Sequence, residues 1–179
     1  MREEKKILGE ERREMILKWL KEAERPLTGT ELARRTNVSR QVVVQDISLL
    51  KAKKEPIIAT SQGYLYMNMK QEGEKRRRVI ACKHDPEETR NELFILADHG
   101  VTVKDVTIEH PVYGDLTASV MVSTRQEVEL FLEKMENTNA ALLSELTDGT
   151  HLHTIEADTN KQLDEACREL DRAGYLLRS

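Results

Sequence analysis

The chain has 179 residues, of which 34% are charged and 4% are aromatic, and its net charge is −4. That length fits one ordinary domain or two small ones, and no run approaches the ~20 apolar residues of a membrane span. Residues 1–70 hold 15 Lys and Arg against 10 Asp and Glu, whereas residues 71–179 hold 13 against 22. This asymmetry favours nucleic acid as a partner of the first part and a cation or another partner for the second, although solvated helix faces that happen to differ would also produce it.

The start of the chain and its cysteines indicate the compartment. Residues 1–14 (MREEKKILGEERRE) lack the apolar segment of a signal peptide. Cys82 and Cys167 are far apart in sequence and form no CxxC pair. We interpret both as small apolar core residues of a protein in a reducing compartment. We therefore expect a soluble, cytoplasmic protein that does not bind a membrane.

Three helical patterns open the chain, and a tight turn joins the second to the third. Thr28 and Glu31, three positions apart, predict a capping box at the start of the second helix. Ser39 predicts the cap of the third helix, and Asn37 suits the turn because asparagine tolerates a left-handed backbone. Such a helix-turn-helix is typical of proteins that lay the second of the two helices in the DNA major groove.

The third helical pattern has one apolar side and one polar side. Val43, Ile47 and Leu50 fall on the same side, which predicts that they are buried. The opposite side suits base edges, because Arg pairs with guanine, Gln with adenine, and valine methyl groups contact thymine. The candidates for phosphate contacts nearby are Thr28, Thr30, Lys51, Lys53 and Lys54. The predicted DNA-binding residues are Thr28, Thr30, Ser39, Arg40, Gln41, Val44, Gln45 and Ser48.

Two short β-like runs, 57–60 and 64–67, follow the third helix and predict a hairpin. After a helix-turn-helix, such a hairpin is a candidate wing. A single helix in a groove reads only a few base pairs, so we expect a homodimer bound to double-stranded operator DNA. The alternative is a winged helix that binds a protein.

From residue 79 onward, strand and helix patterns alternate. Their order, β-α-β-β-α-β followed by α-β, predicts an α+β fold: a ferredoxin-like βαββαβ sandwich with one extra unit. The last predicted strand covers residues 175–177. The predicted domains are a winged helix-turn-helix domain over 1–68, a polar linker over 69–78, and an effector- and metal-binding domain over 79–179.

Histidines and carboxylates of the second part form a candidate metal site. His151 and His153 are two positions apart on a predicted strand and therefore share a face. His84 ends the first strand of the same domain, and either Glu88 or Glu92 on the following helix could turn toward it. Three imidazoles and one carboxylate suit Ni²⁺, Zn²⁺, Co²⁺ or Fe²⁺. The alternative for the His-x-His pair is two exposed or hydrogen-bonded histidines.

A second candidate site lies in the predicted loop 110–116 (HPVYGDL). His110, Tyr113 and Asp115 offer polar groups beside apolar neighbours, a combination that can hold a small molecule. We predict these three as effector-binding residues. An ordinary connection between strands explains the same residues equally well.

Two motifs resemble known families. LTGTELARRTNVSRQVVVQDISLLK, residues 27–51, resembles the winged helix-turn-helix of the biotin-repressor type, and HPVYGDL together with DGTHLHT resembles the 3H domain. Their combination resembles the niacin-responsive repressors of NAD biosynthesis and niacin-transport genes. The resemblance implies a homodimeric repressor with nicotinic acid as co-repressor and one divalent transition metal per chain, chiefly Ni²⁺ or Zn²⁺. It implies the ligands His84, Glu92, His151 and His153, and so selects Glu92 over Glu88.

Two alternatives accompany this interpretation. The first is a transition-metal-responsive repressor in which the ion itself is the signal. The second is a metal-dependent hydrolase fused to a DNA-binding module, because a metal with a free position can activate water. The sequence has no G-x-S-x-G, phosphate loop or G-x-G-x-x-G. We therefore expect no enzyme.

Overall fold

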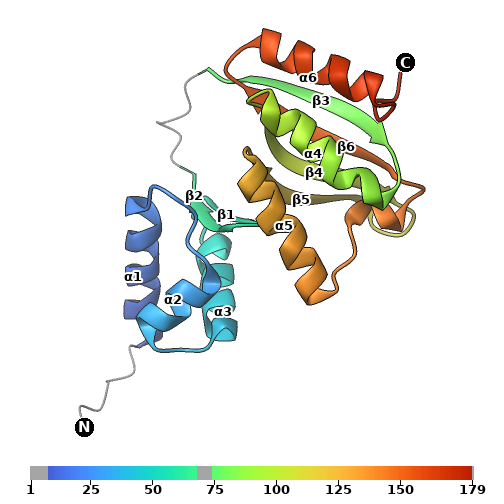
Figure 1. The fold of residues 1–179 in the computed structure, drawn as a ribbon. Coiled ribbons are helices and arrows are strands. Elements are labelled where there is room, and N and C mark those ends of the chain that lie inside the picture. The colour runs from blue at the N-terminus through green and yellow to red at the C-terminus, as the bar shows by residue number, and fades with distance from the viewer. Residues whose placement is uncertain (1–7, 68–73, 179) are drawn as a thin grey trace. The chain divides into compact units, whose positions relative to one another are not determined.

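The computed structural model describes residues 8–67 and 74–178 and divides the chain into two compact units, 1–72 and 73–179 (Figure 1). Part of the predicted linker, residues 69–73, lies outside the described residues. The last three residues of that linker, 76–78, belong to a strand of the second unit, because they pair with the strand at 150–157. No helix among the described residues has both the length and the apolar character needed to cross a membrane.

The first unit contains three helices and a two-stranded antiparallel hairpin. These elements are α1 (Gly9–Glu22), α2 (Gly29–Thr36), α3 (Arg40–Ala52), β1 (Ile57–Thr60) and β2 (Gly63–Tyr66). The capping box predicted from Thr28 and Glu31 is present, and Asn37 has the left-handed backbone expected of the turn, with φ of 51°. The Ser39 side chain accepts a hydrogen bond from the backbone N–H of Val42 and caps α3. The sequence prediction of this helix-turn-helix is confirmed.

The inner side of α3 fixes its orientation within the first unit. Val43, Ile47 and Leu50 are buried, as their spacing predicted. Asp46 is also buried and accepts hydrogen bonds from the Arg12 guanidinium of α1, with Nε 2.6 Å from Oδ2. Removing one partner of such a buried pair leaves an uncompensated charge, which is strongly destabilising. The polar side of α3 is therefore held outward by contacts on the opposite side of the helix.

The second unit is built on a four-stranded antiparallel sheet in the order β3-β6-β4-β5. Its strands are β3 (Arg76–Lys83), β4 (Thr102–His110), β5 (Gly114–Val122) and β6 (Thr150–Ala157). Its helices are η1 (Pro86–Glu88), α4 (Thr89–Asp98), α5 (Arg125–Thr138), η2 (Leu143–Leu146) and α6 (Asn160–Arg172). α4 contacts both α5 and α6.

The α+β class and the βαββαβ order of the sequence prediction are confirmed. The first βαβ unit is β3-α4-β4, and β6 lies between its two parallel strands. The second unit is β5-α5-β6, and β4 lies between its two parallel strands. The edge strands are β3 and β5, which differs from a ferredoxin sheet, where the first and third strands are the inner ones. The prediction of a closing strand at 175–177 is wrong. This segment forms a single bridge, Leu176 with Cys82, because only two backbone hydrogen bonds join it to β3.

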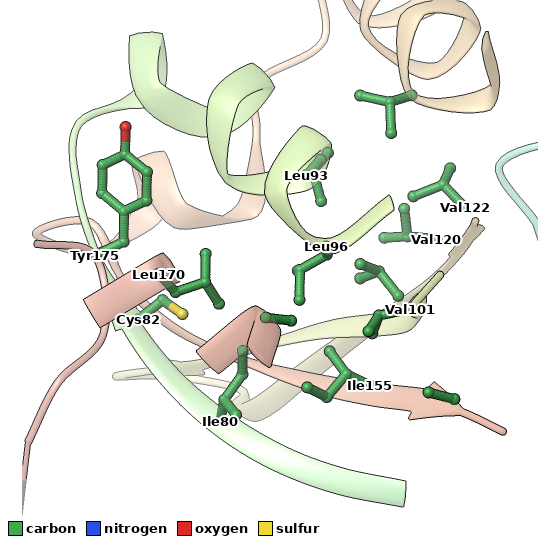
Figure 2. Packing of buried hydrophobic residues seen from close by; sticks show 14 of the residues in the cluster. Ile80, Cys82, Leu93, Leu96, Val101, Val120, Val122, Ile155, Leu170 and Tyr175 are labelled. Carbon is green, nitrogen blue, oxygen red and sulfur yellow. The ribbon is translucent and has the colours of Figure 1, made fainter. Parts of the chain in front are cut away.

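One face of this sheet forms the core of the second unit (Figure 2). The buried cluster consists of Ile80, Cys82, Leu93, Leu96, Val101, Val103, Val120, Val122, Val128, Leu132, Ile155, Ala157, Leu163, Ala166, Leu170 and Tyr175. Fully burying a side chain such as Ile155 stabilises the fold by about 1.5–3 kcal/mol. Side chains alternate between the two faces along a strand. Val79 of β3 therefore lies on the face opposite to Ile80 and is 63% exposed. The same alternation directs Cys82, His151 and His153 toward the helices.

Candidate metal centre

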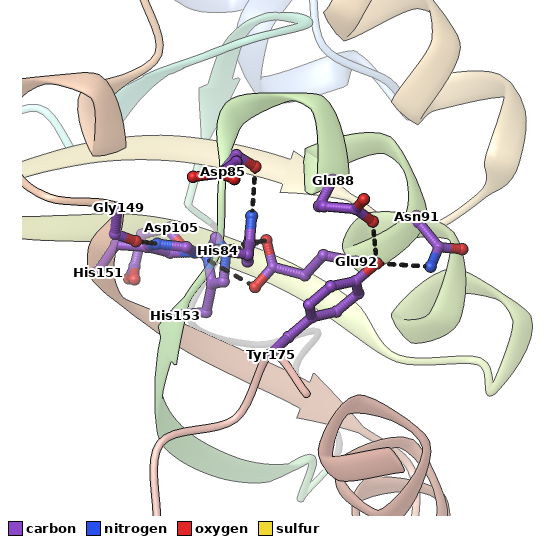
Figure 3. A network of polar contacts seen from close by, with 10 residues as sticks. All are labelled: His84, Asp85, Glu88, Asn91, Glu92, Asp105, Gly149, His151, His153 and Tyr175. Carbon is purple, nitrogen blue, oxygen red and sulfur yellow. Dashed lines mark hydrogen bonds and ion pairs between the residues drawn. The ribbon is translucent and has the colours of Figure 1, made fainter. Parts of the chain in front are cut away.

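Three histidines and one glutamate meet where β6, the end of β3 and α4 come together (Figure 3). His84 follows β3, His151 and His153 lie on the inner face of β6, and Glu92 lies on α4. We call His84, Glu92, His151 and His153 the histidine–glutamate centre. Glu92 is 0% exposed, His151 3% and His153 4%. All four side chains named by the family resemblance are thus brought to one place, deep inside the second unit.

The Nε2 atoms of all three rings face the Glu92 carboxylate. His84 Nε2 lies 2.8 Å from Oε2, and His153 Nε2 lies 3.4 Å from the same oxygen. His151 Nε2 lies 3.2 Å from Oε1 and 3.4 Å from Oε2. One carboxylate therefore gathers three ring nitrogens within a few ångströms.

Backbone carbonyl groups hold the opposite nitrogen of each ring. His84 Nδ1 lies 2.8 Å from the carbonyl oxygen of Asp85, and His151 Nδ1 lies 2.8 Å from that of Gly149. His153 Nδ1 lies 2.7 Å from the carbonyl oxygen of Asp105. A carbonyl accepts hydrogen bonds only, so each Nδ1 carries a proton, and each ring in its neutral form presents an Nε2 lone pair to Glu92. Metal-binding histidines are oriented in this way, by donating the other ring N–H to a carbonyl or carboxylate.

This arrangement of donor atoms suits added positive charge. With neutral rings, three nitrogen lone pairs face carboxylate oxygens, and none of these atoms has a proton to donate. His84 Nε2 lies close to Glu92 but lacks hydrogen-bond geometry. Among the buried side-chain N and O atoms of the described residues, only His84 Nε2 and Thr89 Oγ1 have no hydrogen-bond partner. Buried polar atoms are rarely left in this state. Protons or a metal ion would resolve it, and imidazoles with a carboxylate fit a borderline divalent ion.

The charges inside the centre shift its titration. Burial alone would raise the pKa of Glu92, but the three histidines outweigh it and hold that pKa well below the ordinary 4.5. Burial opposes the charged form of His84 and of His153, yet the Glu92 carboxylate outweighs burial and raises the pKa of each above the ordinary 6.5. The carboxylate is therefore ionised at neutral pH and attracts positive charge into a buried position.

Glu88, the other carboxylate that sequence spacing allowed, is turned away from the centre. It accepts a hydrogen bond from the Tyr175 hydroxyl, which in turn accepts one from Asn91 Nδ2 at 2.8 Å. The Tyr175 ring packs against the His84 ring, with centroids 5.1 Å apart. Tyr175 and Asn91 were missed by sequence reasoning, since the predicted closing strand gave Tyr175 no role beyond packing.

Cys82 also lies beside the centre. Its Sγ, a carboxylate oxygen of Glu92 and a ring nitrogen of His151 all lie within 4.8 Å of one another. Sequence reasoning interpreted this cysteine as an apolar core residue, and it does belong to the buried cluster. The signal that it missed was strand pairing, because Cys82 stands directly opposite His151 in the β3–β6 register.

Gly149 gives a sharp test of how the loop before β6 supports the centre. Its φ is +91°, and a Cβ added there would lie 2.4 Å from the carbonyl oxygen of His84, closer than real Cβ atoms approach. We expect Gly149→Ala to displace His84 and the Gly149 carbonyl that holds His151, and to weaken any metal binding at the predicted site by about 10–100-fold. Competition titration against a chelator measures this, with Gly174→Ala as a positive-φ control, since a Cβ there meets no atom within 4 Å. Equal losses in both variants would contradict it.

The predicted effector residues His110, Tyr113 and Asp115 lie around the turn that joins β4 to β5. His110 Nδ1 accepts hydrogen bonds from the backbone N–H groups of Val112 and Tyr113, at 3.2 and 3.3 Å. Tyr113 is 74% exposed, and its ring lies 5.0 Å from that of His110. The histidine thus stabilises the turn, and an effector here would bind on an open surface.

The residues predicted to contact DNA fall into two groups. Arg40, Gln41, Gln45 and Ser48 are exposed along α3, and Val44 between them is half-buried. The hydroxyl groups of Thr28 and Ser39 cap α2 and α3, and the Ser48 hydroxyl donates to the carbonyl of Val44. Thr30 is exposed in the first turn of α2. The long polar side chains of α3 are thus free of capping roles, whereas three of the hydroxyls already serve the fold.

The fold and the site define a DNA-binding regulator with a separate α+β domain, and comparison with known proteins identifies the family. Residues 12–65 match an HTH domain and residues 77–179 match the 3H domain. The chain is 59% identical over 179 residues, covering 99% of both chains, to "Transcription repressor NadR" of Bacillus subtilis (strain 168). It is 38% identical over 172 residues, 96% of this chain and 97% of the relative, to "Probable transcription repressor NiaR" of Thermotoga maritima.

The chain therefore belongs to the family of transcription repressors that join a helix-turn-helix to a 3H domain. The family resemblance carried by the two motifs is confirmed. The chain is a DNA-binding repressor and not an enzyme, because its relatives are named as repressors. That finding sets aside the alternative of a metal-dependent hydrolase fused to a DNA-binding module.

Proposed function

We propose that this repressor holds one divalent transition ion, Ni²⁺ or Zn²⁺, in each chain at the histidine–glutamate centre. We further propose that it uses nicotinic acid as co-repressor, binds operator DNA as a homodimer, and controls genes of NAD biosynthesis or niacin transport. The observation that carries the proposal is the convergence of three Nε2 atoms on one buried carboxylate. The family resemblance supports nicotinic acid and the homodimer.

The chain's own residues supply the parts of this sensor. Three backbone carbonyls fix the rings of the centre, and Glu92 provides the negative charge that attracts an ion. A bound ion would supply a Lewis-acidic position for the pyridine nitrogen or the carboxylate of nicotinic acid. Occupancy would favour one arrangement of the homodimer and hence one spacing of its two α3 helices. Effector and operator must then raise each other's affinity by the same factor.

The test is a four-way binding experiment on the full-length protein. Operator affinity is measured with and without nicotinic acid, on metal-free and on metal-loaded protein, using a duplex selected by the loaded protein. We expect nicotinic acid to tighten operator binding 5–150-fold in the loaded protein, about 1–3 kcal/mol of coupling, and to do nothing in the metal-free protein. Unchanged operator affinity in the loaded protein would refute the co-repressor role.

The second candidate is a repressor for which the ion itself is the signal. The observation that favours it is burial: none of the four side chains of the centre is more than 5% exposed. In this case metal addition and chelation alone change operator affinity, and nicotinic acid has no effect. The four-way experiment separates the two candidates.

The raised pKa values predict how metal affinity depends on pH. In the folded protein the pKa values of His84 and His153 lie above 6.5. As pH falls, these two rings therefore become protonated at a higher pH than a histidine of the unfolded chain. In the metal-free protein this protonation stabilises the fold below pH 6.5, and that stabilisation is lost as pH rises through the folded pKa values. Metal binding needs neutral rings, so protons and metal compete.

We therefore expect metal affinity to fall as pH is lowered from about 8 to about 6, by up to about tenfold per pH unit for each ring that is protonated. Isothermal titration calorimetry across this range, in buffers of different ionisation enthalpy, also counts the protons released. An affinity that stays constant over the range would contradict the assignment of the histidines as ligands.

A further inference from the structure

Cys82 is placed to do more than fill the core. It lies near the end of β3, is fully buried, and points toward the helix-covered side of the sheet with Ile80. In the antiparallel pairing of β3 with β6 it stands directly opposite His151, a relation that brings Cβ atoms to about 4.5–5.5 Å. Its Sγ lies within 4.8 Å of both a Glu92 oxygen and a His151 nitrogen. The thiol therefore borders the atoms that would hold the ion.

A second observation points to a ligand at the same place. His84 Nε2 is buried, has no hydrogen-bond partner, and faces Glu92 from 2.8 Å, with only 4% of its side chain exposed. Cys82 stands two residues before His84 and shares Glu92 and His151 as neighbours. Nitrogen, oxygen and sulfur donors thus converge from β3, β6 and α4.

We propose that Cys82 supplies a thiolate sulfur to the ion held by the histidine–glutamate centre and sets the ion preference of that centre. This inference rests on the metal site of the proposed function. On binding, the S–H bond breaks, its proton passes to solvent buffer, and a sulfur–metal bond forms without oxidation of either partner. Thiolate favours Zn²⁺ and other soft or borderline ions over Mg²⁺ or Mn²⁺, whereas carboxylate and imidazole alone discriminate less.

The alternative is a cysteine that only packs. The chain offers a matched control, since Cys167 on α6 is half-buried and its sulfur accepts a hydrogen bond from Arg78 at 3.5 Å. Cys167 is not part of the cluster of ligand atoms around Glu92. Any spectroscopic sign of sulfur ligation should therefore depend on Cys82 and not on Cys167.

The experiment uses Co²⁺, whose visible absorption reports binding and whose near-ultraviolet charge-transfer absorption reports a sulfur ligand. We expect the full-length protein and Cys167→Ser to show both signals. Cys82→Ser and Cys82→Ala should keep the visible bands and lose the charge-transfer band. We also expect Cys82→Ser to lose Zn²⁺ affinity by roughly tenfold or more while Mn²⁺ affinity changes little.

The outcomes are distinguishable. Visible bands without charge transfer in the unaltered protein overturn the role of Cys82 and leave the histidine–glutamate centre standing. A charge-transfer band that survives Cys82→Ser also overturns it. No Co²⁺ absorption at all in the unaltered protein overturns the metal centre itself. Because the unaltered protein gives the first answer, the inference stays testable even where a Cys82 variant fails to fold.

Discussion

Glu92→Gln should lose metal affinity by at least about 100-fold, whereas Glu88→Gln should bind metal almost as tightly as the unaltered protein. Glutamine keeps the size of the side chain but removes the charge that three ring nitrogens face. Glu88 instead accepts a hydrogen bond from Tyr175. Sequence spacing allowed either carboxylate, so this pair of matched variants tests the geometric choice directly.

The measurement is a competition titration with a chelator, accompanied by circular dichroism to show that both variants fold. In the proposed repressor, Glu92→Gln should also abolish the response of operator affinity to metal and nicotinic acid. Basal DNA binding should remain, because the first unit has its own buried core. Loss of metal binding in Glu88→Gln, with retention in Glu92→Gln, would reverse the assignment.

Local sequence patterns predicted the first unit well because its determinants are local. The capping box of Thr28 and Glu31 spans four residues, and the turn at Asn37 depends on the backbone of one residue. The burial of Val43, Ile47 and Leu50 follows from helical period alone. What the sequence did not reveal was the pair of Arg12 and Asp46, because partners 34 residues apart meet only through helix packing.

The candidate centre was accessible from the sequence only in part. The shared strand face of His151 and His153 follows from a period of two, and the structure places both on the inner face of β6. The choice of Glu92 came from the family resemblance, since spacing on α4 did not exclude Glu88. Cys82 and Tyr175 required the register of β3 against β6 and the bridge after α6, which no local pattern encodes.

The order of the strands in the sheet could not be predicted from the sequence pattern either. A βαββαβ sequence is compatible with more than one arrangement of split units, and here β3 is an edge strand paired with β6. This pairing matters for the centre, because it sets Cys82 opposite His151 and carries His84 to the end of the strand beside Glu92. The non-local contacts of the sheet, rather than any single motif, assemble the four side chains.

Arg40→Ala should weaken operator binding by about 1–3 kcal/mol, a 5–150-fold loss, and relax specificity at the base pair that Arg40 is predicted to contact. Arg40 is exposed at the first position of α3, and its aliphatic stem lies 3.4 Å from where a Cβ of Gly29 would be. Gly29 thus leaves room for the Arg40 side chain beside the start of α2. A bidentate pair between arginine and guanine is worth about 1–3 kcal/mol of discrimination against the wrong base.

Lys53→Ala is the matched control at the other end of α3, where the exposed Lys53 is a predicted phosphate contact. It should weaken binding to all duplexes about equally and reduce the slope of log affinity against log salt by about 1. Selection of duplexes from a random library, followed by affinity measurements at several salt concentrations, distinguishes the two variants. The opposite outcome is that Arg40→Ala selects the same DNA sequence and changes only the slope of log affinity against log salt. In that case Arg40 contacts the DNA phosphates, and other residues must recognise the bases.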